Sequence, residues 1–202
     1  MSDRPSRVIG LTGGIATGKS TVAKYIADTH KIPILDADIY ARDAVEIGSP
    51  ILVKIVERYG KSILLTDGNL DRKQLGEIIF QDSSMRQWIE ELIHPYVRDR
   101  FVTESAKLNQ PTGVFVIPLL FEAKMTDLVT ETWVVYCTKE QQLQRLIQRN
   151  SLTLREAESR ISAQMPLEEK CQLADVILDN SGTPAALEAQ ILQALNRSIA
   201  LH

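Results

Sequence analysis

One short run near the N-terminus sets the architecture of this chain: Gly13-Gly14-Ile15-Ala16-Thr17-Gly18-Lys19-Ser20. It matches the pattern G-x-x-x-x-G-K-[ST], in which glycines let the backbone turn so that successive N–H groups point inward. The apolar run Val8 to Leu11 precedes it, and an amphipathic segment with Val22, Ala23 and Ile26 follows it. A strand before the pattern and a helix after it are the context that a phosphate-binding loop requires, so we predict such a loop here.

The residue types of this loop suit a nucleotide with a bound metal ion. The helix N-terminus adds roughly half a positive charge, and Lys19 is expected to reach the β- and γ-phosphates. Ser20 is expected to place its hydroxyl on Mg²⁺, and Thr21 to lie beside the inner phosphates. We therefore assign nucleotide binding to the whole of Gly13 to Thr21. An accidental match within a glycine turn is the alternative, and the surrounding context disfavours it.

Four more short apolar or β-branched runs are typical of buried strands, at 32–35, 114–117, 132–136 and 176–178. Helical stretches separate them, and this alternation predicts an α/β fold, a doubly wound, parallel five-stranded sheet of the P-loop NTPase type. The stretch between the second and third strands is far longer than the dozen or so residues that a crossover needs. We therefore expect one P-loop domain with its core at about 7–40, 112–138 and 173–202 and an inserted helical subdomain at about 41–111.

Capping signals divide the insertion into several helices. The expected starting points are Ser49-Pro50, for a helix that ends at Gly60, then Asp71, then Ser84, and finally His94-Pro95, for a helix that runs to about Asn109.

A second helical excursion, at about 139–172, is expected to form a lid. Leu143, Leu146 and Ile147 share one helix face, and Thr153 to Glu156 forms a capping box. From Thr183-Pro184 onward we expect an amphipathic helix that packs on the sheet.

Composition excludes several classes of function. The hydrophobic share of 44% and the charged share of 24% are those of an ordinary globular chain. A net charge of -3 argues against nucleic acid and anionic membranes as partners. The longest apolar run, Val114 to Phe121, is much shorter than the roughly 20 residues of a membrane helix. Cys137 and Cys171 form no C-x-x-C pair, so we expect a cytoplasmic protein with reduced thiols. We also expect a monomer or small homo-oligomer.

Phosphate-binding loops serve GTPases, motors and small-molecule kinases, so other residues must discriminate among them. A guanine-reading motif would need an aspartate that Thr138-Lys139-Glu140-Gln141 lacks, and the D-x-x-G match at Asp179 to Gly182 follows the last strand, where no switch belongs. A kinase instead needs a carboxylate near the γ-phosphate of ATP. Asp36-Ala37-Asp38 supplies two at the end of the second strand, at the sheet edge from which the loop opens. Helix capping is the alternative role for both aspartates.

Taken together, these residues resemble the dephospho-coenzyme A kinase family over about residues 8–185. The motifs that carry the resemblance are Leu11 to Ile15, Gly18 to Thr21, Asp36-Ala37-Asp38 with Ala41-Arg42, Leu70 with Arg72, His94-Pro95, Pro118-Leu119-Leu120-Phe121-Glu122, Arg160-Ile161 with Gln164, and Ala174-Asp175 leading to Asp179-Asn180-Ser181-Gly182. The resemblance implies that ATP phosphorylates the ribose 3'-hydroxyl of dephospho-coenzyme A, the last step of coenzyme A synthesis.

The resemblance also implies catalytic roles. Asp38 corresponds to the family's proposed catalytic base, and Asp36 to a supporting or metal-shell carboxylate. Arg145 and Arg149 resemble lid arginines that close over the phosphates of ATP as charge develops on the transferred group. Solvated arginines on a helix face are the alternative. Asn180 is a candidate for hydrogen bonding to adenine, or an ordinary turn asparagine.

Binding of the acceptor falls to the inserted helices in this resemblance. The candidates are Arg42, Arg72, His94 and Arg98, with Leu119 in the run that follows the third strand. A surface or capping role is the alternative for each of the four polar side chains. Glu122 could hold the water shell of Mg²⁺ or pair with an arginine of the insertion.

Two positions depart from the family's pattern. Ala16 stands where the family often has a third loop glycine, and we expect it to be tolerated if its φ is negative. Asn150 follows Arg149 where the family has an aspartate, and it keeps an acceptor without the charge. The remaining alternatives are a nucleoside-monophosphate or sugar kinase of similar build, and a non-catalytic ATP-binding regulator.

Overall fold

The computed structural model describes residues 5–197, and they form two compact units. We call residues 36–103 the helical unit and the rest of the described chain the core unit. The helical unit overlaps most of the range expected for the inserted subdomain.

The sheet consists of the five expected strands, and the predicted fold class is confirmed. The strands are β1 (Arg7–Gly13), β2 (Ile34–Asp36), β3 (Thr112–Val116), β4 (Glu131–Tyr136) and β5 (Val176–Asp179). Their order is β2-β3-β1-β4-β5, and β1 pairs in parallel with both β3 and β4, as β4 does with β5. The central position of β1 explains its composition, because a strand with neighbours on both sides and both faces covered favours a continuous apolar run.

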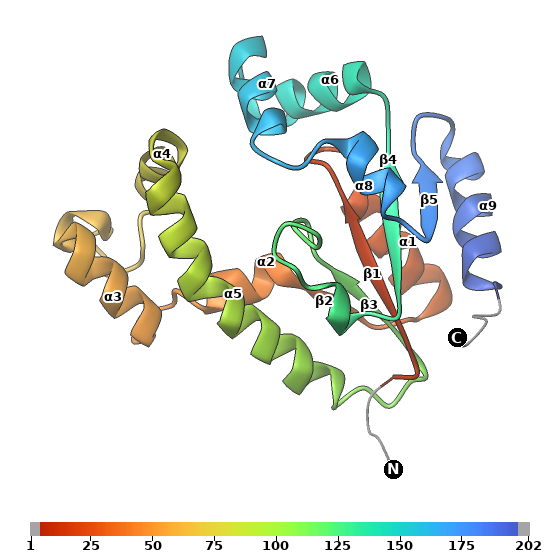
Figure 1. Ribbon diagram of the computed structural model, residues 1–202, viewed down its shortest axis with the longest axis horizontal. Coiled ribbons are helices and arrows are strands. Elements are labelled where there is room, and N and C mark those ends of the chain that lie inside the picture. The colour runs from red at the N-terminus through yellow and green to blue at the C-terminus, as the bar shows by residue number, and fades with distance from the viewer. Residues whose placement is uncertain (1–4, 198–202) are drawn as a thin grey trace. The chain divides into compact units, whose positions relative to one another are not determined.

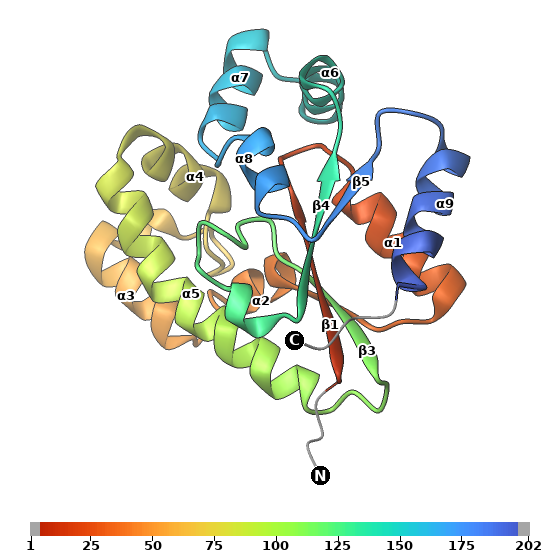
Figure 2. The same ribbon diagram turned by 45° about the vertical axis from the view of Figure 1, so that its right-hand side comes forward.

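Helices cover both faces of this sheet. The core unit contains α1 (Lys19–His30), the short 3₁₀ helix η2 (Thr126–Leu128), α6 (Lys139–Asn150), α7 (Leu154–Ser162), α8 (Leu167–Gln172) and α9 (Pro184–Leu195). Figures 1 and 2 show α1 and α9 side by side along one face, where Val22, Ile26 and Ile191 are buried against Ile9 and Trp133. On the other face, α8 packs on β4. The amphipathic tail helix is therefore packed on the sheet, as its sequence predicts.

The segment expected to form a lid, at about 139–172, consists of α6, α7 and α8. The predicted capping box is present, since the Thr153 hydroxyl accepts from the backbone N–H of Glu156 and the Glu156 side chain accepts from that of Thr153. A second capping box, formed by Thr138 and Gln141, opens α6. These caps satisfy donors that a helix start leaves free, so α6 and α7 start where local chemistry dictates.

The helical unit holds α2 (Ala37–Asp43), α3 (Pro50–Tyr59), the 3₁₀ helix η1 (Lys61–Ile63), α4 (Arg72–Gln81) and nearly all of α5 (Ser83–Ser105). Ser49 caps α3, Gly60 ends it and Asp71 caps α4, as predicted.

The prediction of a separate helix from His94-Pro95 to about Asn109 is wrong. Pro95 lies inside α5, which runs without a break from Ser83 to Ser105. An interior proline removes one backbone hydrogen bond and costs about 3 kcal/mol. Ile89, Val97 and Phe101 are at most 5% exposed on either side of Pro95, and the burial of such side chains offsets a cost of that size.

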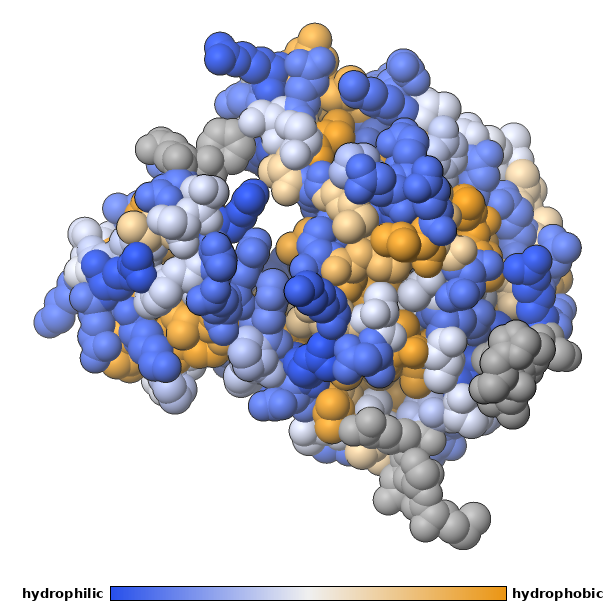
Figure 3. Space-filling model, in the orientation of Figure 1, coloured by the Kyte–Doolittle hydropathy of each residue, from blue (hydrophilic) through white to orange (hydrophobic). Residues whose placement is uncertain are grey.

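The surface carries no sign of a membrane span. Figure 3 shows a face covered mainly by hydrophilic residues, with hydrophobic ones scattered among them. Within residues 5–197, no helix is both long and apolar enough to cross a bilayer.

Arg7 connects the start of β1 to the end of α9. Arg7 donates to Glu131 Oε1 at 2.6 Å and to the carbonyl oxygens of Leu195 at 2.6 Å and Ala194 at 3.0 Å. Its side chain is 14% exposed and that of Glu131 is 12% exposed. Arg7 thus compensates a nearly buried carboxylate and satisfies the last carbonyls of α9.

We predict that Arg7→Met destabilises the protein by about 3 kcal/mol, because it leaves the Glu131 carboxylate nearly buried without its cation. Urea unfolding followed by circular dichroism measures the change. Lys24→Met is the matched control, since it breaks the exposed pair with Asp28 and should leave the unfolding midpoint in place. Equal shifts for the two variants would contradict the role given to Arg7.

Candidate active site

The loop after β1 begins at a glycine that no other residue could replace. Gly13 has a φ of 144°, and a Cβ on it would lie 2.6 Å from the carbonyl oxygen of Val135 on β4. Gly18, with a φ of 105°, is the N-cap residue of α1. Both glycines therefore provide backbone conformations that the loop needs to wrap around a phosphate.

Ala16 also adopts a left-handed conformation, with a φ of 61°. The condition under which we expected an alanine to be tolerated, a negative φ, is therefore not met. The αL conformation costs an alanine about 1 kcal/mol relative to right-handed geometry, because its Cβ crowds the following carbonyl. This explains why a glycine suits the position, and it shows that Ala16 is held there by its surroundings.

The loop presents free donors to its interior. The N–H groups of Ala16, Gly18 and Ser20 carry no hydrogen bond among the described residues, and the Ser20 side chain is exposed. The N–H of Ile15 is occupied by Gln164. The Lys19 ammonium donates to the carbonyl oxygens of Gly13 at 2.9 Å and Gly14 at 2.8 Å.

This donor set fits nucleotide phosphates. It combines backbone N–H groups, a helix N-terminus and one ammonium group, which are the elements that bind phosphate oxygens. The Ser20 hydroxyl at the start of α1 suits a hard cation such as Mg²⁺, which prefers oxygen ligands. Among the described residues, no group of three or more His, Cys, Asp or Glu side chains could hold a metal ion by itself. A magnesium ion here would therefore depend on nucleotide oxygens and water.

Arg145 and Asn180 meet behind this loop. The Arg145 guanidinium donates to the carbonyl oxygens of Asn180 at 2.9 Å and Thr17 at 3.4 Å, and Asn180 Nδ2 donates to Thr17 at 2.8 Å. A Cβ on Gly18 would collide with the Asn180 amide. Arg145 is therefore a partly buried member of the loop's surroundings and does not lie as a solvated arginine on a helix face.

Arg149 behaves differently from Arg145. It is exposed near the end of α6, where its Nε donates to Asn150 Oδ1 at 2.9 Å. Asn150 thus acts as an acceptor for this arginine, as its amide chemistry allows. The two lid arginines occupy unlike environments, one against the loop and one in solvent.

Neither cysteine is bridged. Cys137, at the end of β4, is buried, and Cys171 on α8 is partly buried. Burial raises the pKa of the Cys137 thiol, although the Arg145 cation acts in the opposite direction. The thiol is therefore protonated at neutral pH and is a poor nucleophile.

Glu122 has a partner that the sequence did not reveal. Its Oε1 lies 2.8 Å from the ammonium of Lys170, which is fully buried, and accepts from the backbone N–H of Met165 at 3.1 Å. Lys170 also donates to the carbonyl oxygen of Pro118 at 2.9 Å. Lys170 lies in a polar helical stretch, so nothing in the local sequence indicates that it is buried. Glu122 Oε2 is buried and has no hydrogen-bond partner among the described residues.

The two aspartates after β2 differ in their surroundings. Asp36 is the N-cap residue of α2, and its Oδ1 accepts from the backbone N–H of Asp38 at 2.8 Å. The capping role is therefore real for Asp36. The Asp38 carboxylate is exposed, and none of the hydrogen bonds and ion pairs found among the described residues involves it.

Within the helical unit, two of the predicted acceptor residues, Arg42 on α2 and Arg72 on α4, are in contact. Arg72 donates to the carbonyl oxygen of Arg42 at 3.2 Å, and both side chains are exposed. Sequence reasoning missed Arg100, whose guanidinium lies 5.0 Å from the Tyr40 ring and 3.6 Å from the Asp43 carboxylate. It lies two residues after Arg98, and nothing in its local pattern distinguished it.

His94 and Leu119 are only partly accessible. Burial lowers the pKa of His94 from its ordinary value of 6.5, and the Glu90 carboxylate opposes this shift. His94 is therefore neutral at pH 7 and would recognise an acceptor by hydrogen bonding. Arg98 is half-buried on α5, and Leu119 is half-buried in the turn after β3.

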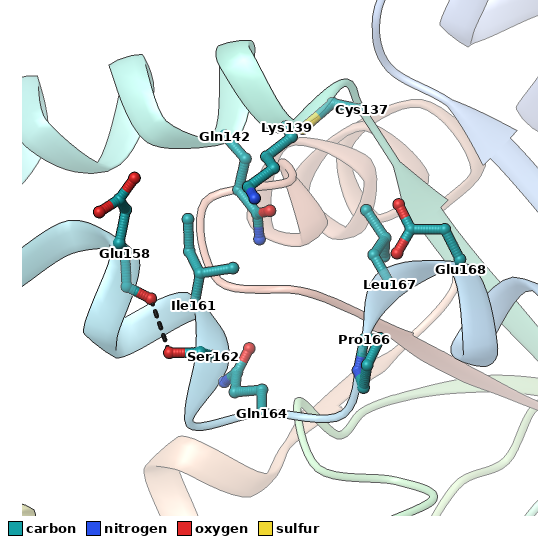
Figure 4. A pocket seen from close by; sticks show the side chains of 10 residues that line it. All are labelled: Cys137, Lys139, Gln142, Glu158, Ile161, Ser162, Gln164, Pro166, Leu167 and Glu168. Atoms are coloured by element: carbon teal, nitrogen blue, oxygen red, sulfur yellow. Dashed lines mark hydrogen bonds between the residues drawn. The ribbon is translucent and has the colours of Figure 1, made fainter. Parts of the chain in front are cut away.

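The core unit also contains a cavity of about 410 Å³ among α6, α7 and α8. Figure 4 shows Gln142 and Gln164 among the side chains that line it, with Ile161 and Leu167 nearby. Ile161 and Gln164 belong to a motif that carries the family resemblance, while none of the residues given a catalytic or binding role from the sequence lines this cavity.

Comparison with known proteins places the whole arrangement in a family. The family model for dephospho-CoA kinase matches residues 7–185. The chain belongs to the dephospho-CoA kinase family. The kinase of that name from Nostoc sp. is 61% identical over 94% of this chain and 97% of its own, and that from Synechocystis sp. is 58% identical over 93% and 94%.

Solved structures agree with this assignment. The dephospho-CoA kinase from Campylobacter jejuni is 29% identical with a TM-score of 0.68, over 93% of this chain and 94% of its own. A protein from Thermus thermophilus is 32% identical with a TM-score of 0.82, over 95% and 96%. The shikimate kinase from Aquifex aeolicus, at 18% identity and a TM-score of 0.53 over 93% and 95%, shares the fold.

In this dephospho-CoA kinase family member, we predict that Ala16→Gly stabilises the fold slightly. The change relieves about 1 kcal/mol of αL strain, and the greater entropy of glycine in the unfolded chain cancels part of that gain. Ala16→Val should destabilise by more than 1 kcal/mol, because a β-branched side chain is poorly tolerated at positive φ. Urea unfolding of both variants measures the difference, and a stabilising valine would contradict the left-handed geometry.

Proposed function

We propose that this protein transfers the γ-phosphoryl group of ATP to the 3'-hydroxyl of dephospho-coenzyme A, giving coenzyme A and ADP, with Mg²⁺ as the cofactor. The observation that carries the proposal is the loop at Gly13 to Ser20, with free N–H groups and a lysine in one cradle, inside a chain matched over residues 7–185 by the family.

The loop and Lys19 bind and orient the phosphates of ATP. The Lys19 ammonium exchanges its two carbonyl acceptors for phosphate oxygens, which carry full negative charge and make stronger hydrogen bonds. Ser20, together with water, would hold Mg²⁺, which would supply neutralising charge for the phosphates of ATP. Arg145 donates to the carbonyl oxygen of Thr17 and so stabilises the loop next to the bound nucleotide. Asn180, which contacts the same carbonyl, is the candidate for hydrogen bonding to adenine. The exposed Arg149 is free to approach the transferred group.

Asp38 serves as the base in this proposal. Its carboxylate accepts the proton of the acceptor hydroxyl as the oxygen attacks the γ-phosphorus in line. Asp36 contributes by capping α2 and so fixing the first turn on which Asp38 stands. The Asp38 side chain is exposed, so its carboxylate is accessible to an acceptor hydroxyl.

The acceptor is assigned to the side chains of the helical unit. Arg42, Arg72 and Arg98 supply positive charge for its phosphate groups, and His94 supplies a neutral hydrogen-bonding group. Leu119 offers an apolar contact in the core unit. Glu122 keeps Oε2 available for the water around Mg²⁺, although Oε1 is committed to Lys170. The two unbridged cysteines support a location in the reducing cytoplasm.

The decisive assay is acceptor-dependent ADP release with Mg-ATP, using dephospho-coenzyme A beside a panel of nucleosides, nucleoside monophosphates and sugars. We expect turnover with dephospho-coenzyme A alone, loss of that turnover in Lys19→Ala, and reversible loss on removal of Mg²⁺ with EDTA. Turnover with another acceptor only would replace the substrate. Tight ATP binding without any acceptor-dependent release would establish a regulator.

We predict that Asp38→Asn lowers kcat by a factor of about 10²–10⁴, the usual contribution of a general base, with little change in the KM for ATP. Asp28→Asn, at an exposed aspartate in the last turn of α1, is the matched control and should keep full turnover. Near-normal kcat in Asp38→Asn would remove Asp38 from the mechanism.

A further inference from the structure

One residue of the phosphate-binding loop is held by lid side chains at both of its backbone polar groups. The N–H of Ile15 donates to Gln164 Oε1 at 2.9 Å, and the carbonyl oxygen of Ile15 accepts from Gln142 Nε2 at 2.7 Å. The two glutamines come from different parts of the lid, α6 and the connection between α7 and α8. A glutamine side chain offers one acceptor and two donors, so this pairing uses the amide chemistry of both side chains.

Gln142 is packed firmly against the loop. It is only 4% exposed, and a Cβ on Gly14 would lie 2.5 Å from its Nε2. In Figure 4, Gln142 extends from α6 and Gln164 from the connection before α8, and both border the same cavity. A buried amide that loses its hydrogen bond leaves a polar group unpaired, which costs free energy. This cost favours the conformation in which Gln142 keeps its hydrogen bond to Ile15.

Gln164 owes its position to the buried ion pair described above. The next residue, Met165, donates its backbone N–H to Glu122 Oε1 at 3.1 Å. Glu122 is in turn 2.8 Å from Lys170, which is fixed to Pro118. The backbone that carries Gln164 is thereby attached to the turn after β3, and its side chain reaches the loop from a fixed base.

We propose that Gln142 and Gln164 are positioning residues for ATP, which set the shape of the phosphate-binding loop by holding Ile15. Ile15 precedes Ala16, whose φ of 61° is unfavourable for a residue with a Cβ. With both polar groups of Ile15 fixed, the loop keeps this left-handed turn and the N–H of Ala16 stays free for a phosphate oxygen. The inference rests on the proposed function, since it concerns the binding of the phosphoryl donor.

The opposite role, in which Gln164 competes with ATP for the loop, would change the affinity for ATP in the opposite direction. If Gln164 instead competed with phosphate for the N–H of Ile15, its removal would strengthen ATP binding. If both glutamines position the loop, removal of either weakens ATP binding. Because both act through the same residue, the loss of one should remove most of what the other contributes.

The experiment compares Gln142→Met, Gln164→Met and the double variant with Gln144→Met, a control at an exposed glutamine on α6. Methionine keeps the size of the side chain and removes its hydrogen bonds. We expect each single change to weaken equilibrium ATP binding and raise the KM for ATP about fivefold to tenfold, the value of one or two hydrogen bonds. The double variant should lose clearly less than the product of the two factors. The KM for dephospho-coenzyme A should stay constant.

Hydrogen exchange gives a readout that general destabilisation would not mimic. The amide of Ile15 should lose protection in Gln164→Met and keep it in Gln164→Glu, which retains an acceptor at the same reach, while the amides of β1 remain protected. Gln144→Met should match the wild type in every measurement.

Three results would overturn the proposal: ATP binding unchanged in the single variants, ATP binding tightened by Gln164→Met, or fully multiplicative effects in the double variant. Absence of turnover in the wild type with every acceptor would instead refute the proposed function. The equilibrium measurements with ATP would still decide the role of the glutamines.

Discussion

The structure depends on the lack of room at the point where the chain leaves β1. The backbone passes so close to Val135 on β4 that the residue there can have no side chain, and Gly13 also takes a φ of 144°. Because β1 is central in the sheet, both neighbouring strands fix the direction in which the loop begins. This direction in turn determines where the loop places its free N–H groups, where Lys19 lies and where α1 begins.

What surrounds the loop is polar, and buried polar groups must be satisfied. Arg145 and Asn180 satisfy the carbonyl of Thr17 on one side, while Gln142 satisfies that of Ile15 on the other. A loop that must leave some N–H groups free for phosphate cannot stabilise itself through its own backbone. Its conformation is therefore maintained by side chains from α6 and from the segments after β5 and α7, and strain such as that of Ala16 is offset there.

The fold was largely predictable because its signals are local. The five apolar runs form five strands. Ser49, Asp71 and Thr153 each cap the helix whose start they predicted. Prediction failed where tertiary contacts outweighed a local signal. Pro95 predicted the start of a helix but lies inside α5. The burial of side chains on both sides of it offsets the cost of an interior proline. Lys170, Arg100 and Gln142 looked like ordinary surface residues, because their partners lie on segments far away in the sequence. Gln164 stood in a family motif, but the sequence did not show that it contacts Ile15.

The candidate site shows the same division along the chain. Everything proposed to hold the nucleotide lies in the core unit, while Arg42, Arg72, His94 and Arg98 lie in the helical unit. The proposed base stands where the chain passes from one to the other, since Asp36 ends β2 and also caps α2. A carboxylate at this junction is carried by the sheet and by the first turn of a helix that also contains Arg42. A motif of three residues could therefore nominate Asp38 from local signals alone, because the end of a strand and the cap of the next helix are both visible in the sequence, while its role as a base stays a prediction.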